Sequence, residues 1–119
     1  MKYSELLVWQ RAMDLVTEIY KITSTFPGEE RFGLSSQARR AAVSIPSNIA
    51  EGHGRKATGA YINHLSIAFG SLMELETQTQ IAARLNFIKE DSAATLLNKM
   101  DEIGKMLTGL KNSLSEKTR

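Results

Sequence analysis

Basic side chains gather in the middle of the chain. Arg39 and Arg40 are adjacent, and His53, Arg55 and Lys56 follow within the next two dozen positions. Lysine and arginine bind nucleic acids by neutralising phosphates and releasing counterions. These five residues therefore predict a phosphate-contacting patch at one end of the molecule, which self-association would repeat.

A purely structural interpretation of the same residues stays open. Arg40 could pair with Glu51, although about three helical turns separate them in sequence. Arg55 and Lys56 could serve only to solvate a loop. The overall charge does not decide between the two interpretations, because 15 basic and 13 acidic residues leave a net charge of only +2.

A second group of special residues surrounds Pro46, namely Asn48, Glu51 and Gly52. Proline inside a helix removes one amide donor and clashes with the carbonyl four residues earlier, here that of Ala42. We expect a kink rather than a break, because the apolar spacing continues in phase past the proline. Asn48 is then expected to satisfy the freed backbone group, and Gly52 to contribute to the helix stop. The alternative is that this group forms a binding motif.

Metal and catalytic sites are not expected. His53 and His64 lie near Glu51, Glu74 and Glu76 in sequence, but the Glu-x-x-His pairing of metal-binding bundles is absent. The chain has no cysteine, its serines lack histidine–acid partners at a known spacing, and it has no phosphate-cradling glycine loop. We predict a protein without cofactor that is not an enzyme.

The length of 119 residues predicts a single domain spanning 1–119. No apolar run approaches the roughly 18 residues that a membrane span requires, and the first residues do not resemble a signal peptide. These features predict a cytoplasmic protein that does not contact membranes.

Four segments with helical periodicity must position the candidate residues, at about 5–24, 34–53, 58–85 and 90–114. Ser4 and Thr58 are expected as N-caps. Short connections between helices of this length predict an all-α, antiparallel, up-down-up-down four-helix bundle. Phe26 and Phe32, in the first connection, are expected to pin that loop to the bundle.

The third segment carries two adjacent apolar stripes, which predicts more than one packing partner and favours a homo-oligomer. Gly70 in its middle weakens the helix by about 1 kcal/mol, so close helix contact is expected there. The second segment is rich in alanine and serine, which also allows close approach. Trp9 and the methionines Met13, Met73, Met100 and Met106 are interpreted as core and interface residues.

Four parts of the sequence carry a resemblance to a known family. They are the run Gln37-Ala38-Arg39-Arg40-Ala41-Ala42-Val43-Ser44-Ile45-Pro46-Ser47-Asn48-Ile49-Ala50-Glu51-Gly52, the opening Leu7-Val8-Trp9-Gln10, the loop Phe26-Pro27 with Glu30 and Phe32-Gly33-Leu34, and the run Ile67-Ala68-Phe69-Gly70-Ser71-Leu72-Met73-Glu74-Leu75-Glu76. Together they resemble the four-helix bundle proteins encoded in intervening sequences of bacterial 23S ribosomal RNA genes. The first run is the most specific of the four, and the resemblance covers nearly the whole chain.

This resemblance implies a homo-oligomer, in known relatives a pentamer, from a family with no established biochemical activity. A related branch, the accessory proteins of diversity-generating retroelements, binds nucleic acid and a reverse transcriptase through a basic pentamer surface. The expectation is therefore a self-associating adaptor that binds RNA or DNA, with or without another protein. The alternative is a protein–protein interaction scaffold that binds no nucleic acid.

Overall fold

The part of the chain that the structure describes folds into four long helices, which confirms the all-α prediction. The computed structural model describes residues 1–117, and no strand occurs among them. The helices are α1 (Leu7–Thr23), α2 (Leu34–His53), α3 (Thr58–Arg84) and α4 (Glu90–Lys117), with short 3₁₀ turns η1 (Tyr3–Glu5) and η2 (Gly28–Glu30).

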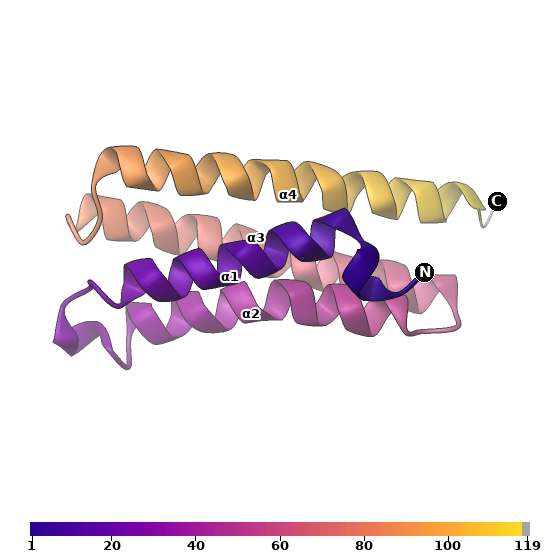
Figure 1. The fold of residues 1–119 in the computed structure, drawn as a ribbon, viewed down its shortest axis with the longest axis horizontal. Coiled ribbons are helices and arrows are strands. Elements are labelled where there is room, and N and C mark those ends of the chain that lie inside the picture. Colours follow the sequence, from indigo (N-terminus) through magenta and orange to yellow (C-terminus); the bar gives the residue numbers. More distant parts are fainter. Residues whose placement is uncertain (118–119) are drawn as a thin grey trace.

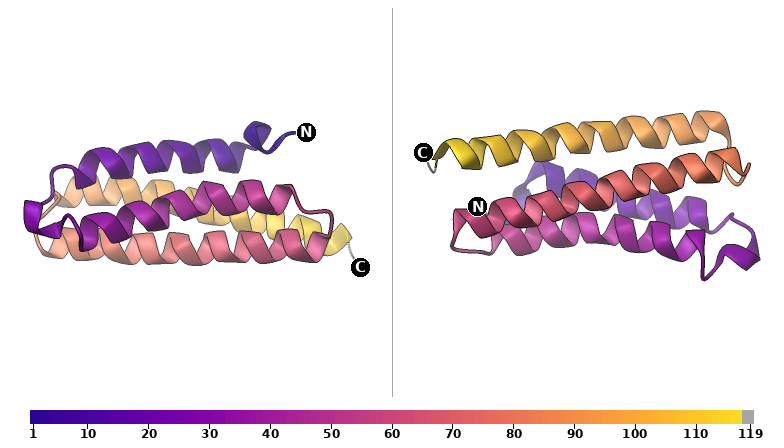
Figure 2. Two further views of the ribbon diagram at one scale, coloured as in Figure 1. Left: turned by 90° about the horizontal axis from the view of Figure 1, so that it is seen from below. Right: turned by 180° about the vertical axis from the view of Figure 1, so that it is seen from behind.

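The helices run alternately up and down, in sequence order, around an elongated bundle of 48 × 23 × 20 Å. The N-terminus, the end of α4 and the α2–α3 connection lie at one end of the bundle, while the α1–α2 and α3–α4 connections lie at the other (Figures 1 and 2). Helix α2 packs against α1 and α3, and α4 packs against α3 with a sparser contact to α1. The two ends are therefore about 48 Å apart and present different loops.

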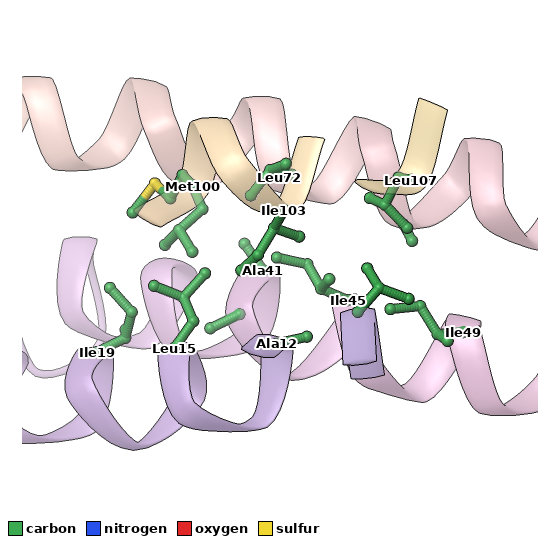
Figure 3. Close-up of a cluster of buried hydrophobic side chains, with 14 of the residues drawn as sticks. Ala12, Leu15, Ile19, Ala41, Ile45, Ile49, Leu72, Met100, Ile103 and Leu107 are labelled. Carbon is green, nitrogen blue, oxygen red and sulfur yellow. The ribbon is translucent and has the colours of Figure 1, made fainter. Parts of the chain in front are cut away.

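The predicted apolar stripes meet along the bundle axis. Figure 3 shows Leu15 of α1, Ile45 of α2, Leu72 of α3 and Ile103 of α4 converging on one cluster. All four side chains are at most 2% exposed. Burying a side chain of this size contributes about 1.5–3 kcal/mol, so contacts of this kind hold the helices together.

Much of the doubled stripe of α3 is buried within one chain. Leu65, Leu72 and Leu75 are fully buried in the core shared with α2, and Phe69 lies against Gly104 of α4. Helix α3 thus has two partners in its own bundle. The doubled stripe therefore does not by itself require a second copy of the chain.

The helix starts differ slightly from the predictions. Helix α1 begins after Leu6, and Ser4 lies in η1, where its carbonyl accepts a hydrogen bond from Gln10 Nε2. The N-cap of α3 is Ala57, and Thr58 is its first residue. Neither expected side-chain cap forms, because α1 starts two residues later than expected and the N-cap of α3 lies one residue before Thr58.

Two predicted packing roles are wrong. Phe26 is half-buried and its ring lies 5.5 Å from that of Phe87, but Phe32 is 88% exposed and pins nothing. A Cβ atom built on Gly70 would meet nothing within 4 Å. The close α2–α3 contact is instead made beside it, where Ser71 Oγ donates to Ser44 Oγ at 2.8 Å.

No helix in the described part of the chain combines the length and apolarity needed to cross a membrane.

Candidate nucleic-acid interface

The predicted basic cluster is divided between two regions of the bundle. Arg39 and Arg40 lie in the first half of α2, near the α1–α2 connection, whereas Arg55 and Lys56 lie in the α2–α3 connection. With a rise of 1.5 Å per residue, α2 separates the two pairs by about 20 Å. The expectation of one patch at one end is therefore wrong, and the two pairs belong to separate regions of the surface.

Arg39 is held in place by helix α1. Its Nε donates to Thr23 Oγ1 at 2.8 Å, and an Nη donates to the carbonyl of Tyr20 at 3.4 Å. Its guanidinium carbon lies 4.7 Å from the centre of the Tyr20 ring, within cation–π range. Arg39 therefore joins α1 to α2 and keeps a fixed positive charge at the surface.

A surface hollow of about 650 Å³ lies beside Arg39. Arg31, Arg39 and Arg40 line it, together with two exposed aromatic residues, Phe32 and Tyr20. Ser36, Val43 and Ser44 complete the lining. Among the described residues that line the hollow there is no carboxylate, so its three positive charges are uncompensated within it.

The nearest acidic residue in sequence has another role. Glu30 is half-buried, and its Oε1 accepts a hydrogen bond from the backbone N–H of Leu34 at 3.1 Å. This bond satisfies one of the free amide groups at the start of α2. The Glu30 carboxylate thus caps a helix, and it is not among the groups that line the hollow.

At the other end of α2, Arg55 and Lys56 are exposed, but His53 is engaged on both sides. His53 Nε2 lies 2.8 Å from the carbonyl of Met1, and Nδ1 lies 3.1 Å from the hydroxyl of Tyr61. Because a carbonyl only accepts, Nε2 donates to Met1; when the ring carries this one proton, Nδ1 accepts from the Tyr61 hydroxyl. Burial raises the pKa of Tyr61, which keeps its proton available. His53 therefore fastens the N-terminus rather than offering a phosphate contact.

Helix α2 continues without a break through Pro46, which is buried. The expected role of Asn48 is only partly correct. Its Nδ2 donates to the carbonyl of Ser44 at 2.9 Å and to Ser44 Oγ at 3.0 Å, not to the carbonyl of Ala42 that the proline leaves free. Asn48 thus bonds the carbonyl four residues before it, one of the local backbone groups that asparagine side chains commonly bond.

Asn48 also links α2 to α3 through His64. Because Nδ2 of Asn48 donates, Oδ1 accepts, so His64 Nδ1 donates to it across 3.0 Å. Glu51 Oε2 lies 3.8 Å from the same His64 nitrogen. Glu51 therefore faces α3, and the alternative pairing with Arg40 is not what the structure has. The group around Pro46 is a helix-to-helix contact.

Gly52 completes this contact and lies within α2, with Gly54 as the C-cap. A Cβ atom on Gly52 would lie 2.8 Å from the Cβ of His64 and 3.0 Å from the Tyr61 ring. The close approach of α2 and α3 thus requires glycine at this position.

The part of the chain that the structure describes holds no group of three histidine or acidic side chains placed to bind a metal ion.

Sequence reasoning missed Arg31, Phe32 and Tyr20 as members of the hollow. Arg31 and Phe32 are neighbours in a glycine-flanked connection, and an aromatic next to a basic residue in a loop is the one signal that could have indicated them. Tyr20 lies in an apolar stripe of α1 and gave no such signal. Only the pairing of α1 with α2 brings it to Arg39.

An apolar groove adjoins the hollow on the same two helices. Tyr3, Trp9, Met13 and Val43 line it, with Val16, Pro46, Ser47 and Ala50. Val43 lines both the groove and the hollow. Met13 and Val43 are 42% and 40% exposed, so this face of the bundle presents apolar area next to the three arginines.

Comparisons with known proteins found a similar crystal structure and a matching family. A crystal structure of a protein of unknown function from the S23 ribosomal protein family of Bacteroides thetaiotaomicron VPI-5482 superposes with a TM-score of 0.80 at 25% identity, covering 88% of this chain and 98% of that one. No curated protein matches the sequence. Residues 4–109 match the family described as 23S rRNA-intervening sequence protein. The chain therefore belongs to the 23S rRNA-intervening sequence protein family.

Proposed function

We propose that this protein is a non-enzymatic, self-associating bundle of the cytoplasm that binds nucleic acid at the hollow lined by Arg31, Arg39 and Arg40. The observation that carries the proposal is the convergence of three arginines, with no carboxylate among the residues that line the hollow. Arginine binds phosphates in bidentate fashion and stays charged at every physiological pH.

Three contacts per chain give weak binding, so self-association matters to the mechanism. A homo-oligomer, which we take to be a pentamer as in the family's known members, presents the hollow several times. A nucleic acid that spans neighbouring hollows gains avidity without any new contact. This arrangement also explains how a chain of net charge +2 can bind a polyanion.

The apolar groove is the surface that we assign to self-association. Its exposed Met13 and Val43 would lose contact with water in the oligomer, which favours association. Because Val43 also borders the hollow, copies that meet at the groove bring their arginines close to the subunit boundary.

Paired charge-removing variants test the binding site. Arg31→Ala with Arg40→Ala should weaken binding of a fluorescent RNA, measured by anisotropy, and should lower the slope of log Kd against log salt by about 2. Arg39 is kept because its bonds to α1 support the fold. The matched control, Lys105→Ala with Lys117→Ala on α4, removes the same charge elsewhere and should change the slope less.

A third pair of substitutions tests which of the two basic regions binds nucleic acid. Arg55→Ala with Lys56→Ala should leave most of the binding intact, because these residues lie about 20 Å from the hollow along α2. If this pair removes binding and the Arg31 and Arg40 pair does not, the site is at the α2–α3 connection. If wild-type protein binds no nucleic acid at low salt, the protein-scaffold alternative replaces the adaptor.

A further inference from the structure

Phe32 is the most exposed of the aromatic side chains in the hollow. It is 88% exposed, which is unusual for a large apolar ring, whereas Tyr20 is 44% exposed. The Phe32 ring forms no part of either buried apolar cluster. Leaving such a ring in water forgoes the stabilisation that its burial would contribute. A binding partner that covers the ring would recover this contribution.

The two aromatic rings differ in what already covers them. The Tyr20 ring carries the Arg39 guanidinium at 4.7 Å, and that guanidinium is tied to Thr23 and to the Tyr20 carbonyl. The Phe32 ring has the Arg31 guanidinium 5.4 Å from its centre, yet the residue is still 88% exposed. Phe32 is therefore the ring with a face free to receive a planar partner.

We propose that the hollow takes single-stranded nucleic acid, with an unpaired base stacked on Phe32 and the adjoining phosphates on Arg31 and Arg40. This inference rests on the proposed function and specifies its ligand. Aromatic rings beside basic side chains are how proteins bind single strands without reading sequence, because every base has a π-face. A duplex offers the same phosphates but keeps its bases stacked inside, so it leaves Phe32 uncovered.

Abasic oligonucleotides separate the base contact from the phosphate contacts. The probes are a labelled thymidine DNA of about twelve nucleotides, the same backbone with abasic positions, the corresponding RNA and a duplex. Wild-type protein should bind the base-bearing single strands about tenfold more tightly than the abasic strand, as loss of stacking on one aromatic side chain predicts. RNA and DNA should behave alike, because both carry bases and phosphates.

Variants of Phe32 assign the preference to its ring. Phe32→Ala should abolish the tenfold preference, leave abasic and duplex binding unchanged and keep the salt slope. Phe32→Tyr keeps a ring and should retain the preference. Leu7→Ala, which truncates a 53% exposed side chain at the far end of α1, is the matched control and should change nothing. Because Phe32 is exposed, its variants should keep the helical circular-dichroism spectrum of the wild type.

The outcomes distinguish this inference from the proposed function. If wild-type protein binds abasic and base-bearing strands equally, or if Phe32→Ala keeps the preference, the stacking inference is overturned while phosphate binding stands. If wild-type protein binds none of the probes at low salt, both the inference and the proposed function are wrong.

Discussion

Gly52 shows how one residue sets the distance between two helices. Alanine there should destabilise the protein by about 1–3 kcal/mol, because its Cβ would meet the His64 Cβ at 2.8 Å and the Tyr61 ring at 3.0 Å. Urea denaturation at fixed protein concentration measures the change. Gly70→Ala is the matched control: nothing lies within 4 Å of its Cβ position, so it should stabilise α3 by about 1 kcal/mol. Equal effects from the two variants would contradict the assigned contact.

Asn48 uses both ends of its amide, donating to Ser44 and accepting from His64. Asn48→Ala should lower the free energy of unfolding by about 1–2 kcal/mol, because it leaves half-buried partners unsatisfied. Thermal or urea denaturation provides the measurement. Ser66→Ala, at an exposed position of α3, should change stability by no more than about 0.5 kcal/mol. An unchanged denaturation midpoint for the Asn48 variant would exclude the bridging role.

At the scale of single residues, the sequence indicated which positions are structurally important better than it indicated what they contact. Gly52 was expected to contribute to the helix stop and Asn48 to satisfy a backbone group freed by Pro46, whereas in the structure both lie in the contact between α2 and α3. The partner of each could not be predicted, because His64 reaches Asn48 only when α2 and α3 adopt one particular register. For the same reason Gly70 was misassigned, since helical periodicity alone does not tell on which side of α3 a glycine faces a neighbour.

The contact between α3 and α4 carries an electrostatic penalty at Glu76. Burial, with a smaller contribution from the nearby Asp101 carboxylate, raises the pKa of Glu76 above its ordinary value of 4.5. The folded state therefore holds the Glu76 proton more tightly than the unfolded state, and ionisation of Glu76 disfavours folding. The penalty is absent at pH values below the pKa of Glu76 in the unfolded state, and it is fully present at pH values above its pKa in the folded state.

Glu76→Gln removes this ionisation and should stabilise the protein at neutral pH. The gain should shrink as the pH falls through the range just above 4.5, where wild-type Glu76 becomes protonated. Denaturation of both proteins at several pH values measures the difference. Glu74→Gln, at an exposed position of the same helix, is the control and should show a smaller dependence. A gain from Glu76→Gln that is equal at acidic and neutral pH would contradict the assignment.

At the element scale, the helices were predictable because their apolar spacing is regular. Three of the four predicted helix starts lie within one residue of the observed ones, and α4 extends three residues beyond its predicted end. The start of α1 was missed because η1 takes up Ser4. The α1–α2 connection was the least predictable element, since its exposed Phe32 contradicts the usual burial of aromatic rings.

At the scale of the whole molecule, the groove on α1 and α2 should join copies of the chain. Light scattering should give the mass of an oligomer, and Met13→Glu should shift the protein to smaller species by placing a charge in that apolar contact. Met73→Glu introduces the same charge at a 37% exposed position of α3, the helix whose doubled stripe first indicated self-association. Dissociation by Met73→Glu alone would place the interface on α3, and a monomeric wild-type mass would contradict self-association.

The arginine hollow became visible only when the helices were paired. Arg39 and Arg40 were recognised from sequence, but Arg31, Phe32 and Tyr20 join them through the contact of α1 with α2 and the path of their connection. Arg55 and Lys56 were grouped with them because sequence proximity was taken for spatial proximity. A helix of twenty residues spans about 30 Å, so the two pairs lie far apart.

The most direct test of nucleic-acid binding by this bundle is the salt dependence of its affinity for a single-stranded RNA. Fluorescence anisotropy across a series of salt concentrations gives log Kd against log salt for the wild-type protein. We predict binding at low salt that weakens steeply and linearly on this plot, as the release of several counterions requires. Absence of binding at the lowest salt, or an affinity that does not change with salt, would contradict phosphate recognition by Arg31, Arg39 and Arg40.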